Sequence, residues 1–250
     1  MLTKDQVVCL RTVVYSETSQ IVTLFGRSTG KFDAIAKGSR RAKSAFEGPI
    51  EVFAFGQAVF SPRSQGLATL TELQQAPRFV GLRRRFHGLQ CGLCGVELLD
   101  ALTEPYDPDP ALFDQGVAFL EDLQTFTDEA DDLRRLIVFQ WGLLQAIGGG
   151  LVLTHCANCR APYTGRWPRA YFSSTAQGLV CPDCEPAFVD RLALDRAAVA
   201  CLAELRRLKE AAEPTLRRIE IVLLEHFSNL LHRRPRTAAF FLGGRDGQRT

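Results

Sequence analysis

The sequence predicts an α+β chain, in which a β-rich first part precedes a helical part that carries a four-cysteine loop. Short runs of Val, Ile, Phe and Thr fill the first 76 residues. From about Leu82, apolar residues recur every three or four positions, as on one face of a helix. We therefore expect a β domain at 1–80, a helical domain at 81–235 with an insertion at 151–190, and a flexible tail at 236–250.

The β-rich part contains five expected strands, each bounded by turn-forming Gly and Ser residues. They are Val7–Tyr15, Ile21–Phe25, Lys31–Lys37, Glu51–Phe60 and Leu67–Leu73. In the fourth strand, alternation places Phe53 and Phe55 on one face. Five strands in fewer than 80 residues suit a small closed barrel. We therefore expect a five-stranded OB-fold β-barrel, with a small open sheet as the alternative.

Five helices are expected after the barrel. Leu89, Leu93 and Val96 mark the first, and Pro110 opens the second. The third runs from Leu133 to Ala146 and ends at a run of three glycines. The last two are amphipathic and lie near Leu192–Lys209 and Pro214–Leu231.

Four cysteines are interpreted as core residues rather than ligands. Cys91 and Cys94 form a C-x₂-C pair, but they lie in an apolar, helix-like run where small buried thiols are common. Cys9 and Cys201 are isolated in the sequence, and we expect both in the core.

The other four cysteines form the most specific pattern in the chain. Cys156-Ala-Asn-Cys159 and Cys181-Pro-Asp-Cys184 are two C-x₂-C hooks separated by 21 residues. Such hooks present four thiolates to one tetrahedral Zn²⁺. Four protein ligands leave no open coordination position, so we expect one structural zinc ion and no metal chemistry.

Alternatives to this zinc site remain at this point. His155 can replace Cys156 as a ligand, at the expense of the symmetric hooks. Two disulfides are disfavoured because residues following Met1 form no signal peptide, and a thioredoxin-like redox pair lacks its βαβ context. No His has Glu two positions on, which argues against a zinc deaminase.

Charge is unevenly distributed, although the net charge is only +2. Residues 1–87 carry 13 basic and 6 acidic residues, 88–150 carry 2 and 12, and 151–250 carry 15 and 10. A basic start and end around an acidic middle point to an anionic partner. No apolar run reaches the length of about 18 residues that a membrane span needs, so we expect a soluble, cytoplasmic protein without a membrane partner.

Nucleic-acid binding is predicted for the segment from Gly26 to Lys43, which contains a single acid, Asp33. Its Gly- and Ser-rich loop with guanidinium groups suits phosphate binding, and its place on a barrel strengthens the prediction. The candidate DNA-binding residues are Arg27, Lys31, Lys37, Arg40, Arg41 and Lys43, with Arg83, Arg84 and Arg85 at the junction of barrel and helices. The alternative is a solvated charged loop. Besides these two groups, a further basic cluster spans 232–236.

Catalytic motifs do not emerge from the sequence. It contains no G-x-S-x-G, no H-E-x-x-H and no Walker-type phosphate loop. We therefore expect no enzyme activity and no catalytic residues. Two other classes stay open: a zinc-containing nucleic-acid-binding adaptor in transcription or translation, and a metal-dependent nuclease that uses carboxylates of 97–132.

Three segments resemble the bacterial RecO family of DNA repair and recombination proteins. They are Tyr15-Ser-Glu-Thr-Ser, Ile21-Val-Thr-Leu-Phe and Gly30-Lys-Phe-Asp-Ala-Ile-Ala-Lys-Gly-Ser-Arg-Arg. The order of barrel, helices and paired C-x₂-C hooks also matches, so the resemblance covers nearly the whole chain. Some members have lost the zinc cysteines, so the complete set here favours a metal. The family often has Gly after the second cysteine, where this chain has Arg160, and we expect a changed turn that keeps all four ligands.

The resemblance implies a recombination mediator that is not an enzyme. Such proteins bind single- and double-stranded DNA, anneal complementary strands and act on DNA coated by single-stranded-DNA-binding protein (SSB), whose C-terminal tail they contact. With RecR, and in some settings RecF, they help to load RecA. Lys37, Arg40 and Arg41 match the family's basic loop after the third strand. The expected location is the nucleoid in the cytoplasm.

Overall fold

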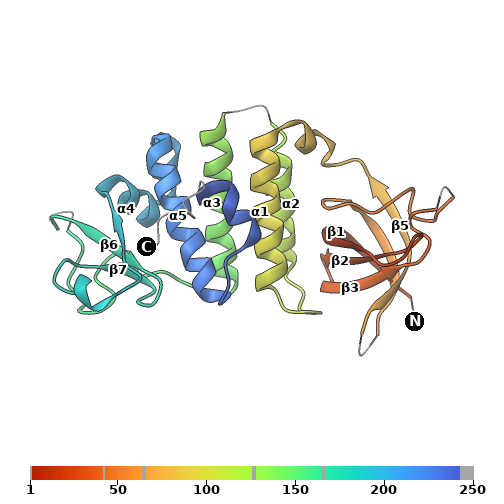
Figure 1. Cartoon of the computed structure of the whole chain (residues 1–250), viewed down its shortest axis with the longest axis horizontal. Coiled ribbons are helices and arrows are strands. Elements are labelled where there is room, and N and C mark those ends of the chain that lie inside the picture. Colours follow the sequence, from red (N-terminus) through yellow and green to blue (C-terminus); the bar gives the residue numbers. More distant parts are fainter. Residues whose placement is uncertain (1, 42, 64–65, 126–127, 165–166, 243–250) are drawn as a thin grey trace, which may run out of the picture. The chain divides into compact units, whose positions relative to one another are not determined.

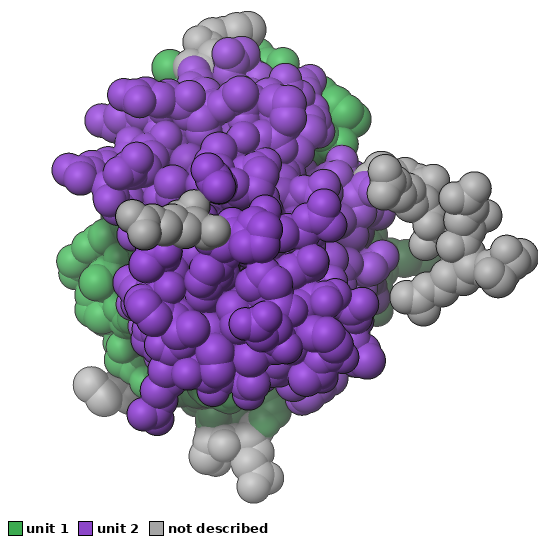
Figure 2. All heavy atoms as spheres, turned by 90° about the vertical axis from the view of Figure 1, so that its left-hand side faces the viewer, with its two compact units in different colours: residues 1–126 green, residues 127–250 purple. Residues whose placement is uncertain are grey.

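The computed structural model describes residues 2–41, 43–63, 66–125, 128–164 and 167–242. The chain divides into two compact units, residues 1–126 and 127–250, which Figure 2 distinguishes by colour. The first unit contains a β-barrel and two helices. The second contains the remaining helices and a small sheet (Figure 1).

Five strands form the closed barrel of the first unit: β1 (Thr3–Val14), β2 (Gln20–Gly26), β3 (Gly30–Ala36), β4 (Phe55–Ser61) and β5 (Ala68–Ala76). Their order around the barrel is β1-β2-β3-β5-β4, and β1 pairs with β4 to close it. The pairing of β3 with β5 is parallel, and all others are antiparallel. This confirms the predicted five-stranded OB-fold over the open sheet.

The barrel interior is filled by alternate strand residues, as the sequence pattern requires. Phe32 and Phe60 stack inside it with ring centroids 4.2 Å apart. The prediction that Phe53 and Phe55 share one face of a strand is wrong, because β4 begins at Phe55. Phe53 has φ = 70° and its N–H donates to the Cys9 carbonyl, so it belongs to a turn that leads into the strand.

Two helices complete the first unit: α1 (Phe86–Leu102) and α2 (Pro110–Asp122), preceded by a 3₁₀ turn at Val80–Arg84. Asp109 caps α2 by accepting the Leu112 N–H at 2.9 Å, and Pro110 occupies the first turn. Cys91 and Cys94 are buried on α1, as predicted, and Cys9 and Cys201 are buried elsewhere.

Glycine at position 92 permits close packing of α1. A Cβ atom there would lie 3.0 Å from a Leu82 methyl carbon and 3.3 Å from the Phe53 ring. The Phe53 turn and α1 therefore meet at a position where a larger side chain would push them apart.

The second unit is built on α3 (Glu129–Ala146), which packs against α5 (Glu213–Leu230). Between them lie β6 (Ala170–Ser173), β7 (Gly178–Val180), β8 (Leu192–Leu194), α4 (Arg196–Ala203) and 3₁₀ turns at Glu185–Ala187 and Leu205–Glu210. The strands form a sheet in the order β7-β6-β8. This helical unit confirms the α+β class, and it adds a small sheet that the sequence did not predict.

The predicted helix at Leu192–Lys209 is wrong at both ends. Leu192–Leu194 pairs with β6 as a strand, and Asp195 then caps α4 by accepting the Ala198 N–H at 2.7 Å. Glu204 has an extended backbone (φ −137°, ψ 91°) and separates α4 from the following 3₁₀ turn. Its carboxylate is held by Arg206 and Arg207, an arrangement that apolar periodicity does not reveal.

At the end of the chain, a flexible tail was expected from residue 236. The structure has a 3₁₀ turn at Arg236–Ala238 and the short helix α6 (Ala239–Leu242), with Ala238 fully buried. The rest of the expected tail lies outside the described residues. Within the described ranges, no helix has the combined length and hydrophobicity needed to span a bilayer.

Candidate nucleic-acid surface and metal centre

The loop that follows β3 carries four exposed cations. We call the segment Lys37–Lys43 the basic loop. The side chains of Lys37, Arg40, Arg41 and Lys43 are exposed, and no ion pair among the described residues involves them. The predicted DNA-binding residues of this loop therefore present their charge to solvent.

A buried glutamine of β2 fixes the basic loop. Gln20 is only 5% exposed, and its Oε1 accepts from the Ser39 hydroxyl and from the Ile50 N–H, both at 2.9 Å. Its Nε2 donates at 2.9 Å to the Ile50 carbonyl and to the Thr12 hydroxyl. All four hydrogen bonds are satisfied inside the protein, so Gln20 anchors the loop and the segment at Ile50 to β1 and β2.

The basic loop lies beside the turn between β1 and β2. The Arg40 N–H donates to the Thr18 carbonyl at 3.1 Å, and the Gly38 N–H donates to the Ser19 hydroxyl at 3.4 Å. The same turn begins after Tyr15, a residue that is 62% exposed. An exposed aromatic ring therefore accompanies the cations.

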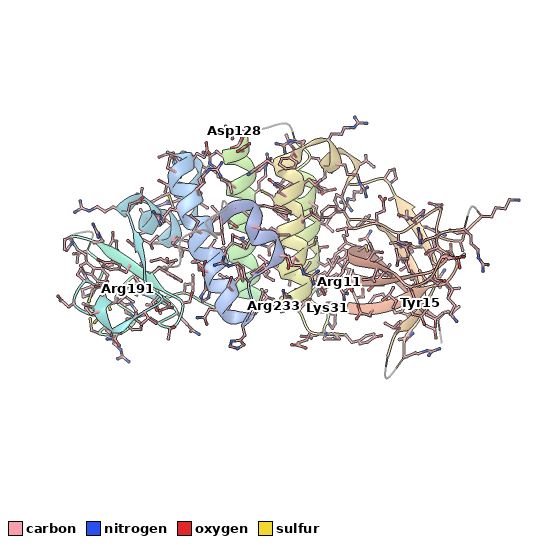
Figure 3. All side chains as sticks on the ribbon, viewed as in Figure 1. Arg11, Tyr15, Lys31, Asp128, Arg191 and Arg233 are labelled. Atoms are coloured by element: carbon pink, nitrogen blue, oxygen red, sulfur yellow. The ribbon has the colours of Figure 1, made fainter. Side chains whose placement is uncertain are left out.

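Tyr15 is a candidate site residue that the sequence analysis did not single out. Figure 3 shows it on the side of the barrel away from α1, whereas Arg11 and Lys31 face α1. The available sequence signal was an aromatic residue directly before the turn Ser16-Glu-Thr-Ser19, because turns are usually polar and exposed.

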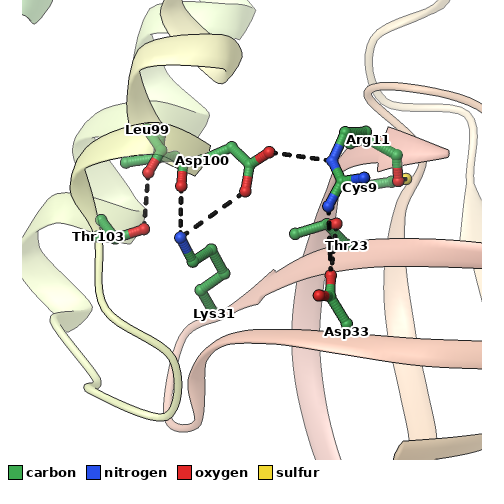
Figure 4. A network of polar contacts seen from close by, with 8 residues as sticks. All are labelled: Cys9, Arg11, Thr23, Lys31, Asp33, Leu99, Asp100 and Thr103. Atoms are coloured by element: carbon green, nitrogen blue, oxygen red, sulfur yellow. Dashed lines mark hydrogen bonds and ion pairs between the residues drawn. The ribbon is translucent and has the colours of Figure 1, made fainter. Parts of the chain in front are cut away.

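The Lys31 side chain, in contrast, is held by Asp100 of α1 and is not free to bind a ligand (Figure 4). Its Nζ donates to the Asp100 carbonyl and lies 3.7 Å from the Asp100 carboxylate, and its side chain is only 14% exposed. The same carboxylate accepts from Arg11 Nε at 3.1 Å, and Arg11 also lies 3.7 Å from Asp33. This network ties α1 to the barrel.

Arg27 also has an acidic partner. Its guanidinium donates two hydrogen bonds to Asp114 of α2, at 2.9 and 2.8 Å. These bonds hold the pKa of the Asp114 carboxyl below its usual value. Although both side chains are exposed, the bidentate geometry neutralises the charge locally.

The three arginines at the junction of barrel and helices, Arg83, Arg84 and Arg85, likewise include side chains held within the protein and one that is exposed. Arg83 forms an ion pair with Glu51, and Arg85 is buried and donates to the Leu123 carbonyl at 2.5 Å. Arg84 is exposed. Just before them, Arg78 pairs with Glu121 at 2.6 Å and lies over the Phe55 ring.

Three carboxylates of the acidic stretch are thus engaged inside the first unit. Asp100, Asp114 and Glu121 all lie on or next to the two helices, and each pairs with a basic residue of the amino-terminal part. The cations of the basic loop have no such partners among the described residues.

The second site is the cysteine cluster, formed by Cys156, Cys159, Cys181 and Cys184. Their sulfur atoms all lie within 4.8 Å of one another, and the Cys159 and Cys181 sulfurs are 3.7 Å apart. Four sulfurs at zinc–sulfur distances of about 2.3 Å in a tetrahedron are separated by about 3.8 Å. The cluster thus has the size that a tetrahedral ion requires. His155 is not part of it.

Two similar turns bring the cysteines together. The Arg160 N–H donates to the Cys156 carbonyl at 2.9 Å, and the Glu185 N–H donates to the Cys181 carbonyl at 3.0 Å. Burial raises the pKa of the Cys156 thiol, but hydrogen bonds from the backbone of Cys159, Cys181 and Asn158 outweigh it and lower the pKa to about 6. The pKa values of Cys159 and Cys181 are raised instead, by burial and by hydrogen bonds to neighbouring cysteines of the cluster. The metal assignment therefore rests on the close approach of the four sulfurs.

Arg160 takes the backbone conformation that glycine favours. Its φ is 64°, in the left-handed region, and the turn keeps its hydrogen bond to Cys156. All four cysteines stay together in the cluster, as expected, and whether the turn differs from that of relatives with glycine stays a prediction. The arginine is accommodated here at the cost of local backbone strain.

Two family models match the chain. "Recombination protein O N terminal" matches residues 1–77, and "Recombination protein O C terminal" matches residues 83–238. The DNA repair protein RecO of Rhodopirellula baltica is 31% identical over 210 residues, which cover 84% of this chain and 75% of that protein. RecO of Anaeromyxobacter dehalogenans strain 2CP-C is 33% identical (81% and 77% covered), and RecO of Bacillus subtilis is 31% identical (74% and 69% covered).

Proposed function

The chain belongs to the RecO family of DNA repair proteins, and from this premise we propose that it is a recombination mediator without enzyme activity. It binds single- and double-stranded DNA without sequence specificity, and anneals complementary strands. The observation that carries this proposal is the basic loop, whose four exposed cations have no acidic partner within the described residues.

The loop suits contact with the phosphate backbone. Cations that neutralise phosphates release condensed counterions, which gives affinity that falls with salt and does not depend on base sequence. Guanidinium groups such as those of Arg40 and Arg41 also bind phosphate through paired hydrogen bonds. Since Gln20 fixes the base of the loop, little conformational entropy is lost when DNA binds.

We assign DNA contact to Lys37, Arg40, Arg41, Lys43 and Arg84. Arg27 and Arg83 reach DNA only in competition with their carboxylate partners. Lys31 and Arg85 contribute by holding the first unit together.

Annealing requires two polyanions to approach, and a basic surface lowers their repulsion. In cells the protein acts on SSB-coated DNA, contacts the SSB tail and helps to load RecA with RecR and, in some settings, RecF. The family resemblance supports these partner roles, and with them a location at the nucleoid in the cytoplasm.

One zinc ion held by the cysteine cluster completes the second unit. All four ligand positions come from the protein, so the ion supports structure. Zinc content near one ion per chain, lost on removal of Cys156 and Cys181, is the expected result of elemental analysis. A fully folded chain without metal would contradict this assignment.

The decisive experiment is annealing of complementary strands coated with SSB, with and without the protein. The wild-type chain is expected to accelerate annealing, and the double variant R40Q/R41Q to lose most of this effect. R206Q/R207Q is the matched control, since it removes two cations that are already paired with Glu204. Equal activity of all three proteins would refute the loop assignment.

Two alternative classes are tested in the same preparation. A nuclease would cleave labelled DNA in the presence of Mg²⁺ or Mn²⁺, whereas a mediator leaves both strands intact. A sequence-reading adaptor would show strong discrimination among unrelated competitor oligonucleotides, whereas a backbone-binding protein shows little.

A further inference from the structure

A basic, aromatic hollow lies in the second unit, whereas the basic loop belongs to the first unit. Its volume is about 540 Å³, within the range of ordinary ligand sites. Tyr163 and Trp167 line it from the segment before β6, together with Arg169. Arg196 at the start of α4 and Arg218 of α5 line the rest.

The three arginines of the hollow are exposed, and no ion pair among the described residues involves them. The neighbouring arginine differs: Arg217, next to Arg218 on α5, pairs with both Glu129 and Glu213. The single acid lining the hollow is Asp195, whose carboxylate is engaged in capping α4. The hollow thus concentrates positive charge, which favours an anionic ligand.

Its aromatic wall is held in place. The Tyr163 and Trp167 rings meet edge to face, with centroids 5.2 Å apart and an interplanar angle of 84°. Trp167 also packs against the buried group of Cys156, Val180 and Cys181. Rings fixed in this way offer stacking at low entropic cost.

We propose that this hollow is a second binding site for single-stranded DNA, in which a base stacks on the aromatic wall and flanking phosphates contact the arginines. Planar bases alternate with phosphates along a strand, which matches rings beside guanidinium groups. The inference rests on the proposed DNA-binding function and deepens it, because one molecule with a site on each unit can hold two strands.

Base stacking is tested by fluorescence of the full-length chain. The sequence has two tryptophans, so Trp141→Phe leaves Trp167 as the reporter. Oligothymidine should quench this fluorescence, whereas an abasic strand of equal length should quench it far less. Equal quenching by both strands, or no quenching by either, overturns the proposal, as does quenching by an aspartate-rich peptide but not by DNA.

Affinity measurements separate this site from the basic loop. In the R40Q/R41Q background, Trp167→Ala should weaken the remaining binding of oligothymidine about tenfold. Because Trp167 also packs in the interior, Arg218→Gln provides a surface variant with the same expected direction. Arg217→Gln is the matched control and should have little effect.

The outcomes of these affinity measurements distinguish the second site from the assignment of DNA contact to the basic loop. Loss of binding in R40Q/R41Q with no further loss in Trp167→Ala or Arg218→Gln refutes the second site alone. Full binding in R40Q/R41Q together with loss in the hollow variants refutes the loop assignment and retains the second site. Equal weakening of binding by Arg217→Gln and Arg218→Gln would show that only the loss of positive charge matters, which refutes the site.

Discussion

The basic residues of the first unit fall into two groups that the sequence does not distinguish. On the side facing α1 and α2, Arg11, Lys31 and Arg27 are paired with helix carboxylates. In the basic loop, Arg40 and Arg41 are exposed and have no acidic partner within the described residues. The number of cations in a segment therefore overstates the charge it offers to an anionic ligand. Acids more than 60 residues further along the chain neutralise one group and leave the other available.

The largest effect is expected from replacing Gln20, the residue that anchors the basic loop. Gln20→Ala removes four hydrogen bonds, three of them buried, and leaves their partners unsatisfied, so the free energy of unfolding should fall by about 3 kcal/mol. Chemical denaturation measures this. Gln74→Ala, at an exposed position of β5, is the control and should change stability little. An unchanged midpoint for Gln20→Ala would show that the loop is not anchored there.

Charge reversal tests the loop cations directly. R40E/R41E should weaken binding to any DNA sequence about 100-fold, equivalent to about 2.7 kcal/mol, and lower the slope of log K against log salt by about 2. Titrations at several salt concentrations measure both. The loop assignment is wrong if affinity and slope match those of the wild-type chain.

Variants that disrupt the paired cations should lose stability rather than DNA affinity. Asp100→Ala leaves Lys31 and Arg11 without their carboxylate, so stability should fall by about 2 kcal/mol while DNA affinity stays within about threefold. Asp122→Ala removes the same charge from an exposed position of α2 and controls for net charge. A large gain in DNA affinity for Asp100→Ala alone would mean that Lys31 becomes available to DNA.

Tyr15 lies beside the cations of the basic loop and not beside the paired cations, so its replacement tests the loop separately. Tyr15→Ala should weaken binding of single-stranded DNA about fivefold, or about 1 kcal/mol, and affect duplex DNA little, since stacking needs an unpaired base. Tyr15→Phe keeps the ring and should retain binding. Equal losses for single strands and duplexes would exclude stacking.

The smallest expected effect concerns the strained turn of the cysteine cluster. Arg160→Gly relieves the left-handed backbone at φ = 64° and should stabilise the protein by up to about 1 kcal/mol. Thermal unfolding of the metal-bound protein measures it. A lower melting temperature would show that the arginine side chain contributes more than the strain costs.

Local patterns in the sequence predicted the strands of the barrel, most helices and the four cysteines. Each depends on near neighbours: strand alternation, capping at Asp109, or the spacing of Cys156 and Cys159. Predictions failed where a distant partner decides the backbone. Leu192–Leu194 forms a strand because β6 pairs with it, and Phe53 turns because Cys9 accepts its N–H.

The sequence by itself determined the closed barrel, the helical unit and the cysteine pattern, because alternation, helical periodicity and ligand spacing are encoded within short stretches. Only the tertiary structure decided which cations are available. Ion pairs such as those of Lys31 with Asp100 and Arg27 with Asp114 form between residues far apart in the chain, and the Trp167 hollow gathers side chains from three separate segments. Electrostatic interactions act through space, so their partners become known only when the chain is folded.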